Sequence, residues 1–270
     1  GITCAKIGEA EVMAKSGLND IFLAYPIVGQ HRFARLAALA EKVHLTLAVE
    51  HPDAARALAD FFHARGRQLD ILLEIDTGAH RCGLPPGEEA ENLATFLARL
   101  PGLRFRGLFT YEGHVYAAAS PEEIADRARL SGETVVEVAK RLQARGLPVE
   151  VVSVGSSPAR AAACSVPGVT ENRPGTNIFN DGTQVNLGVC AWEDCALSFL
   201  CTVVSRPAPD RALVDGGAKT FTSERVSDLG GYGAVLGYPG ARFIRLWEEH
   251  GMLSLEAVSY THLTLPTNRE

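Results

Sequence analysis

Strand-like and helix-like patterns alternate along most of the chain. Short apolar runs rich in β-branched residues predict strands at 2–5, 21–25, 45–49, 69–75, 105–111, 149–154 and 169–171. The intervening segments 8–16, 52–65 and 120–145 have helical patterns that each end at a glycine. The last of these opens with Ser120-Pro121-Glu122-Glu123, which has the cap, proline and acid of a helix start. Apolar strands separated by helices are typical of a parallel sheet that is covered on both faces.

The alternation predicts an α/β fold, namely an incomplete (β/α)8 TIM-like barrel that lacks its first strand. We expect residues 1–187 to form this barrel domain. A doubly wound open sheet is the alternative, because periodicity does not distinguish the two architectures. The sequence contains no G-x-G-x-x-G or Walker A motif, which weakens the nucleotide-binding form of that alternative.

The pattern changes near residue 185. From Cys195 onward short strand-like runs follow one another at 197–204, 212–214 and 243–247, and prolines and glycines separate them. We therefore expect residues 188–258 to be the start of a β-rich domain. Residues 259–270 continue none of these patterns and are interpreted as a non-native tail.

Composition excludes several classes of function. The chain of 270 residues is 46% hydrophobic and 21% charged, as globular domains are. A net charge of −6 supplies no basic surface for nucleic acid. No apolar run reaches the roughly 18 residues of a membrane helix. Six scattered cysteines without a C-x-x-C pair suit a reducing compartment, so a cytoplasmic location is predicted. The spacing of Cys190, Cys195 and Cys201 argues against a metal site.

Candidate ligand-binding residues follow the predicted strands, at the end where an α/β barrel binds its ligands. Arg81 comes after an acidic turn with a glycine, and it is interpreted as a fixed cation for an anionic or phenolate oxygen. The alternative is a surface arginine that pairs with Glu88 or Glu89. Arg173 follows a later strand in the same way, which favours the functional interpretation of both.

Two loops are candidates for binding phosphate. The first contains Gly155, Ser156 and Ser157 before an expected helix at 158–163, and the second contains Arg173, Gly175 and Thr176. Backbone amides and hydroxyls at a helix start bind phosphate well, although a plain helix cap has the same sequence pattern. Because the two loops follow consecutive predicted strands, they would face one pocket.

Tyr111 and His114 end another strand and could lie against a cofactor ring or move protons. The alternative is an aromatic cap on the core beside a loop histidine. Two lysines are candidates for a covalent bond to a carbonyl cofactor. Lys6 follows the first strand but equally suits a helix start, and Lys219 lies in the β-rich region.

Six ordered motifs together resemble the D-threonine aldolase and D-serine dehydratase branch of the fold-type III pyridoxal-phosphate (PLP) enzymes, whose barrel is the alanine racemase N-terminal domain. The motifs lie at 2–11, 76–83, 111–114, 155–158, 173–176 and 215–219, and the resemblance extends over residues 1–257. It implies PLP as the cofactor. It also implies a contact from Arg81 to the phenolic oxygen, Tyr111 and His114 beside the ring, Arg173 near the pyridine nitrogen, and a phosphate held by Ser156, Ser157, Gly175 and Thr176.

The resemblance implies a small-molecule substrate, a β-hydroxy D-amino acid, and a homodimeric enzyme. An aldolase of this branch cleaves Cα–Cβ, whereas a dehydratase removes the α-proton and expels hydroxide, and both use a divalent metal at the β-hydroxyl. An amino-acid racemase of the same superfamily, a non-catalytic PLP-binding barrel and an unrelated phosphate- or metal-binding barrel are the alternatives. The β-rich extension argues against a barrel that only carries PLP.

The family's cofactor lysine is expected before residue 1, and its metal ligands beyond the Glu248-Glu249-His250-Gly251 motif. Asn177 also stands where the family has a tyrosine. The sequence is therefore interpreted as truncated at both ends, and we predict that this polypeptide is inactive because it lacks the lysine that bonds to PLP.

Overall fold

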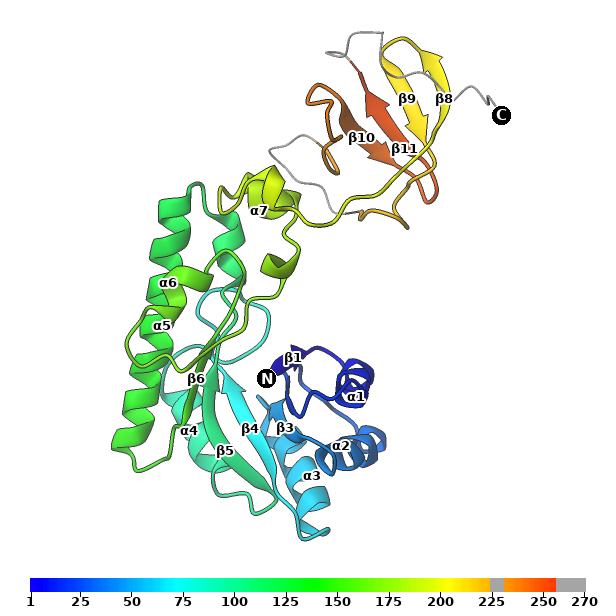
Figure 1. Cartoon of the computed structure of the whole chain (residues 1–270). Coiled ribbons are helices and arrows are strands. Elements are labelled where there is room, and N and C mark those ends of the chain that lie inside the picture. Colours follow the sequence, from blue (N-terminus) through cyan, green and yellow to red (C-terminus); the bar gives the residue numbers. More distant parts are fainter. Residues whose placement is uncertain (224–230, 256–270) are drawn as a thin grey trace. The chain divides into compact units, whose positions relative to one another are not determined.

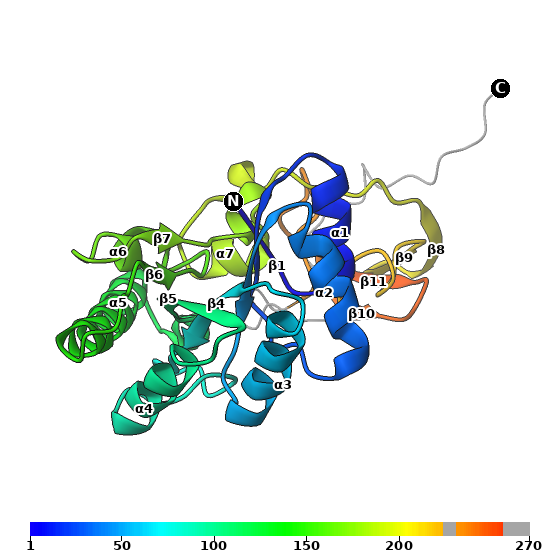
Figure 2. The same ribbon diagram turned by 90° about the horizontal axis from the view of Figure 1, so that it is seen from below.

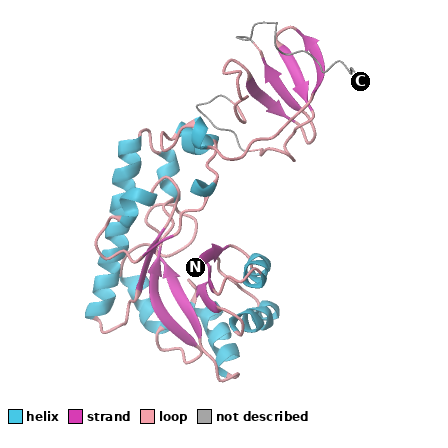
Figure 3. Cartoon of the chain, viewed as in Figure 1, coloured by secondary structure: helices cyan, strands magenta, loops and turns pink. Residues whose placement is uncertain are grey.

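The computed structural model describes residues 1–223 and 231–255 (Figure 1). The chain divides into two compact units, Gly1–Gly175 and Thr176–Glu270. The first unit is an α/β structure, and the second contains a group of strands connected by loops (Figure 3). No helix in the described ranges has the length and apolarity needed to cross a membrane.

The first unit contains a seven-stranded sheet in which each strand pairs in parallel with the next one along the chain. Its strands are β1 (Ile2–Cys4), β2 (Asp20–Leu23), β3 (His44–Ala48), β4 (Leu69–Glu74), β5 (Leu103–Phe109), β6 (Val151–Val154) and β7 (Glu171–Asn172). A doubly wound sheet reverses its strand order at a switch point, and this sheet does not. The structure therefore confirms the TIM-like half-barrel.

Helices follow the strands and lie in an arc outside the sheet (Figure 2). They are α1 (Ile7–Lys15), α2 (Phe33–Ala40), α3 (Pro52–His63), α4 (Glu88–Leu97), α5 (Pro121–Ala144) and α6 (Arg160–Cys164), with 3-10 turns at Gln30–Arg32 and Gly113–Ala117. Helix α5 begins where the sequence predicted it. The Ser120 hydroxyl accepts the Glu123 N–H at 3.2 Å, and Pro121 occupies the first turn, where its missing N–H is not needed.

The two faces of the sheet differ in what they bury. On the outer face, Ile71 and Leu73 of β4 belong to the large core that the helices cover. On the inner face, Leu72 packs with Phe22, Ala48 and Phe109, and the two phenylalanine rings meet edge to face at 5.0 Å. Side chains alternate along a strand, so Asp70 and Glu74 share the inner face with Leu72. The inner face is therefore apolar in its middle and carries an acid at each end of β4.

Asp70 closes the amino end of this inner face. Its carboxylate accepts two hydrogen bonds from Arg104 at 2.6 Å each, one from Arg106 at 2.7 Å, and a contact from His44 at 2.8 Å. The residue is only 6% exposed, so these partners compensate a buried charge. This network joins β3, β4 and β5 at the end opposite to the predicted ligand-binding residues.

The second unit contains a four-stranded antiparallel sheet in the order β10-β11-β9-β8. Its strands are β8 (Val203–Ala208), β9 (Arg211–Val214), β10 (Arg242–Leu246) and β11 (Gly251–Ser254); the unit also has helix α7 (Gly182–Asn186) and 3-10 turns at Thr176–Ile178 and Trp192–Asp194. A small core forms around Val214, Phe243 and Leu253. The expected β-rich character is confirmed, and the interpreted tail at 259–270 lies outside the described residues.

One predicted strand of this unit is misplaced. The apolar alternation favoured a strand at 197–204, but Leu197 and Phe199 are exposed and the strand runs from Val203 to Ala208. Pro207 was interpreted as a separator between strands. It is tolerated inside β8 because β8 is an edge strand, where a residue without an N–H need not interrupt the ladder.

Candidate active site

Arg81 lies in a closed loop after β4. The loop is joined at its base by the Asp76 N–H bonded to the Leu84 carbonyl at 2.8 Å, and the Asp76 side chain accepts the Gly78 N–H at 2.9 Å. The Arg81 guanidinium lies over the Tyr111 ring, with its carbon 4.1 Å from the ring centroid. Arg81 makes no ion pair with Glu88, Glu89 or any other described residue. The guanidinium is therefore exposed at the carboxyl end of the sheet, where stacking on the Tyr111 ring holds it in place.

His114 lies beside the same loop. A side-chain carbon on Gly78 would come within 3.3 Å of the His114 ring, so the glycine permits this close approach. The Nε2 atom is 3.5 Å from the Ser131 hydroxyl, whereas the buried Nδ1 atom has no hydrogen-bond partner among the described residues. Burial, with a smaller effect of Arg127, lowers the pKa of His114. A neutral imidazole with one unpartnered ring nitrogen is equipped to take part in proton transfer.

Arg173 follows β7 and enters the inner face of the sheet, where its side chain is 8% exposed. Its Nε donates to the Ser153 hydroxyl at 2.7 Å, and Nη2 donates to the Thr110 carbonyl at 2.5 Å. The guanidinium lies over Phe109 at 5.3 Å from the ring centroid. Burial lowers the pKa of Arg173, and the nearby carboxylates, Glu112 first, oppose that shift. The cation is thus fixed within the half-barrel.

Glu112 is a fully buried acid within the 111–114 motif, and its sequence position alone indicated no role. Its two carboxylate oxygens each accept the Gly155 N–H at 3.1 Å. Burial raises its pKa, although Arg173 and these hydrogen bonds oppose the rise. A side-chain carbon at Gly155 would lie 2.6 Å from the Arg173 nitrogen, so only glycine fits. The Gly155 N–H, predicted for phosphate, is thus already used within the protein.

The two predicted phosphate loops meet within the first unit. Ser156 and Ser157 are both buried, and the Ser157 hydroxyl accepts the Gly175 N–H at 3.3 Å. The Ser156 hydroxyl is buried beside the Glu112 carboxylate, where it lowers the pKa of that group. Space is open beside Gly175, where a side-chain carbon would meet nothing within 4 Å.

Helix α6 begins at Arg160, after the expected start at 158, so a turn separates these serines from the helix. Thr176 is the first residue of the second unit. These positions leave Ser156, Ser157 and Gly175 together in the first unit, in a loop pair after β6 and β7.

The two candidate lysines have structural roles. Lys6 is exposed at the start of α1, where its N–H and that of Ala5 donate to the Glu9 carboxylate at 3.1 and 2.9 Å. Lys219, in the second unit, pairs with Glu249 at 2.7 Å and with Glu248 at 3.4 Å. The helix-start interpretation of Lys6 is therefore the one that the contacts support.

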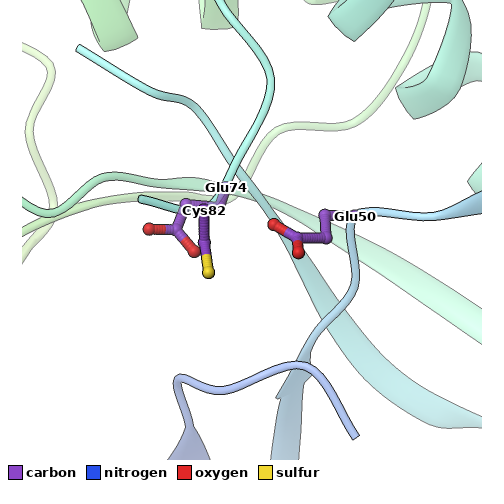
Figure 4. Close-up of side chains that lie close together, drawn as sticks. All are labelled: Glu50, Glu74 and Cys82. Carbon is purple, nitrogen blue, oxygen red and sulfur yellow. The ribbon is translucent and has the colours of Figure 1, made fainter. Parts of the chain in front are cut away.

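A further group of chemically active side chains was not predicted. Ligand atoms of Glu50, Glu74 and Cys82 all lie within 4.8 Å of one another at the carboxyl ends of β3 and β4 (Figure 4). Burial and the neighbouring Glu50 raise the pKa of Glu74 to about 7, against the opposing effect of Arg81 and Arg173. Cys190, Cys195 and Cys201 form no comparable group in the described part of the chain. A signal existed in the sequence, because Glu50 and Glu74 each follow an apolar run.

Comparison with known proteins places this geometry in a family. The family described as alanine racemase, N-terminal domain, matches residues 1–181, and the putative serine dehydratase domain matches residues 196–265. D-threo-3-hydroxyaspartate dehydratase from Delftia sp. (strain HT23) is 35% identical over 94% of this chain and 70% of its own length. Its solved structure superimposes with a TM-score of 0.84. D-threonine aldolase from Arthrobacter sp. is 30% identical over 95% of this chain and 67% of its own length.

Alanine racemase from Clostridium difficile 630 is more distant and shares the fold, with a TM-score of 0.58 and 15% identity over 94% of this chain and 67% of that chain. The family matches and the two lyases agree with the resemblance seen in the sequence motifs. The chain therefore belongs to the fold-type III PLP enzymes that carry an alanine racemase N-terminal domain, and its D-threonine aldolase and D-threo-3-hydroxyaspartate dehydratase relatives are PLP-dependent lyases of β-hydroxy D-amino acids.

Proposed function

We propose that this chain is the PLP-binding part of a lyase that acts on β-hydroxy D-amino acids, of the D-threonine aldolase or dehydratase type. The observation that carries the proposal is the pair of buried serines, Ser156 and Ser157, beside open space at Gly175, on the same end of the sheet as Arg81. A phosphate oxygen placed in that space could accept a hydrogen bond from the Ser156 hydroxyl.

The phosphate fits the loop pair after β6 and β7. We assign Ser156, Ser157 and Gly175 to the phosphate, because the first two offer hydroxyls and the glycine leaves room for close approach, whereas the role of Thr176 stays a prediction. Gly155 has a different role in this account. It allows the chain at Arg173 to pass close by, while its N–H holds the Glu112 carboxylate.

The remaining residues are assigned to the ring and to the substrate. Arg81 would contact the phenolic oxygen, because its charge is unpaired and oriented by Tyr111. Arg173 would lie near the pyridine nitrogen. A guanidinium donates hydrogen bonds and does not give up its proton, so that nitrogen would stay unprotonated. PLP, when bound, supplies the electron sink for breaking a bond at the α-carbon of an amino acid.

Tyr111 and His114 are the candidate catalytic groups. The lowered pKa of His114 keeps its imidazole neutral near pH 7, so Nδ1 or Nε2 can accept a proton from a substrate hydroxyl. Tyr111 orients Arg81 through its ring and offers a hydroxyl as a second proton-carrying group. The divalent metal and the homodimer that the family resemblance implies stay predictions.

PLP binding tests the proposal. Absorbance titration of the chain with PLP should saturate, and Ser156→Ala should weaken the affinity by about tenfold, which corresponds to one hydrogen bond of about 1.4 kcal/mol. Ser165→Ala removes an exposed hydroxyl near the same helix and serves as the matched control, with unchanged affinity. Equal affinities in both variants, or no saturable binding, would contradict the assignment.

The products that the enzyme releases identify the type of reaction. Incubation of the full-length protein with D-threonine and D-serine distinguishes the two lyases, since an aldolase releases glycine from D-threonine and a dehydratase releases a keto acid and ammonia. Racemisation of alanine without either product would instead favour the racemase alternative.

A further inference from the structure

We propose that Glu50, Glu74 and Cys82 form a binding site for a divalent cation of the Zn²⁺ class, built from side chains that the PLP assignment does not use. The three residues lie at the carboxyl ends of β3 and β4 (Figure 4). This inference does not depend on PLP and is tested without it.

The fold brings the two carboxylates together through strand register. Ala48 of β3 pairs with Leu72 of β4, and both belong to the inner apolar cluster. Two residues further along each strand are Glu50 and Glu74, so both acids follow the same inner face to neighbouring positions. Two acids at adjacent register positions repel one another unless a positive charge lies between them.

Glu74 has no direct hydrogen-bonded or ion-paired partner among the described residues, although Arg81 and Arg173 lie near enough to stabilise its charge. The residue is 5% exposed, and its carboxylate forms no hydrogen bond or ion pair with any residue in the described ranges. By contrast, Asp70 at the other end of the same strand has four such contacts. A buried carboxylate without a direct partner is costly, and a cation bound between Glu74, Glu50 and Cys82 would lie closer to it than the two arginines, neither of which forms an ion pair with Glu74.

The closed loop after β4 holds Cys82 in place beside Glu74. The Gly83 N–H donates to Glu50 at 2.6 Å, which also fixes the second carboxylate. Gly83 has a φ of +88°, and a side-chain carbon there would lie 2.9 Å from the Glu74 Cγ, so glycine is required. The Leu84 N–H donates to the Glu74 carbonyl at 3.2 Å. The loop backbone therefore fixes the Glu50 carboxylate and brings Glu74 and Cys82 beside it before any ion binds.

The donor atoms and their separations determine the class of ion. Ligand atoms around a tetrahedral Zn²⁺ lie roughly 3.3–3.5 Å apart, given bond lengths of about 2.0–2.3 Å. The three atoms here lie within 4.8 Å, so modest side-chain rotations bring them to an ion. A thiolate with two carboxylates favours Zn²⁺ or Co²⁺ over Mg²⁺ or Ca²⁺, which prefer oxygen alone. Three protein ligands leave a fourth position for water.

Cobalt is the sharpest probe, because a Co²⁺–thiolate bond produces charge-transfer absorbance in the near ultraviolet. Titration of the metal-stripped chain with Co²⁺ should give this absorbance with a stoichiometry of one, and Zn²⁺ should displace it. Cys82→Ser should abolish the band, whereas Cys164→Ser, an exposed cysteine, should retain it. Glu50→Gln should weaken Zn²⁺ binding by at least about tenfold.

The Glu74→Gln variant tests whether Glu74 is a metal ligand or only supports the structure. The amide removes the repulsion with Glu50, so the metal-free variant should melt at the same temperature as the parent or higher, yet lose the rise in melting temperature that Zn²⁺ gives the parent. A band that survives in Cys82→Ser overturns the proposal. So does a Glu74→Gln variant that melts lower and still binds Zn²⁺, or a parent chain that binds no Co²⁺ at one equivalent.

Discussion

The guanidinium of Arg81 lies 4.1 Å from the centroid of the Tyr111 ring, and this stacking joins the loop after β4 to the end of β5. Neither residue is near the other in sequence. The relationship explains how an exposed arginine without an ion pair keeps one orientation, since a cation over an aromatic face is stabilised by about 0.5–2 kcal/mol.

Replacement of Tyr111 should therefore weaken PLP binding through Arg81. Tyr111→Leu removes the aromatic face and is expected to lower PLP affinity about threefold to tenfold. Tyr111→Phe is the matched control, because it keeps the face and loses only the hydroxyl. Fluorescence titration with PLP measures both. If Tyr111→Phe weakens PLP affinity as much as Tyr111→Leu does, the loss of affinity comes from the hydroxyl and not from the stacking.

Gly155→Ala should destabilise the first unit strongly. The added carbon would lie 2.6 Å from the Arg173 nitrogen, so β6 and β7 would have to separate, at a cost of about 1–3 kcal/mol. Gly8→Ala in α1 is the control. Its nearest neighbour would be a flexible Arg35 nitrogen at 3.9 Å, and alanine favours a helix by about 1 kcal/mol. The melting temperature should fall in Gly155→Ala and rise in Gly8→Ala. A Gly155→Ala protein that melts at the parent's temperature would refute the close-packing argument.

The Asp70 network predicts how stability depends on pH. Burial alone would raise the pKa of Asp70, but hydrogen bonds from Arg104, His44 and Arg106 outweigh it and lower the pKa below its ordinary value. The hydrogen bond to Asp70 in turn raises the pKa of His44 above 6.5, against burial. The contribution of Asp70 to the free energy of unfolding is complete above the ordinary pKa of 3.8. It is lost as the pH falls through the lowered pKa of the folded state.

The contribution of His44 to the free energy of unfolding has the opposite dependence on pH. It is complete below pH 6.5 and is lost as the pH rises through the raised folded-state pKa. His44→Gln should therefore remove the loss of melting temperature that the parent shows as the pH rises above 6.5. Asp70→Asn should destabilise the protein at neutral pH by about 1–2 kcal/mol, because charge-assisted hydrogen bonds to two arginines are lost but the Arg104 side chain is 54% exposed to solvent. A parent protein whose melting temperature is constant from pH 6 to pH 9 would contradict this account.

Lys6 should have no role in holding the cofactor. Its backbone caps α1 and its side chain is exposed, so Lys6→Ala is expected to bind PLP with unchanged affinity. A PLP absorbance band typical of a protonated Schiff base that survives dialysis in the parent chain and vanishes in Lys6→Ala would overturn that expectation.

The barrel elements could be predicted from sequence because their signals are local. Strand β4 is buried over its whole length and has the apolar run Ile71–Leu73 at its centre, and Ser120 with Pro121 gives the start of α5 directly. Strand β8 was misplaced because its place at the edge of the sheet decides whether Pro207 is tolerated, and a short window of sequence contains no information about neighbouring strands.

The site was only partly predictable for the same reason. Positions after strand ends predicted that Arg81, Ser156 and Arg173 would lie at one edge of the sheet, since the carboxyl ends of a parallel sheet meet there. The pairing of Glu50 with Glu74 depends on the register between β3 and β4, and the burial of Glu112 depends on the approach of Gly155 from another strand. Such contacts join residues far apart in the chain, so no single motif contains them.

A crystal structure of the chain soaked with PLP tests the central claim most directly. The account predicts density for the phosphate against the Ser156 and Ser157 hydroxyls beside Gly175, with the phenolic oxygen within hydrogen-bond distance of Arg81. Density for PLP elsewhere, or a phosphate bound by Arg81 that makes no contact with Ser156, would contradict it.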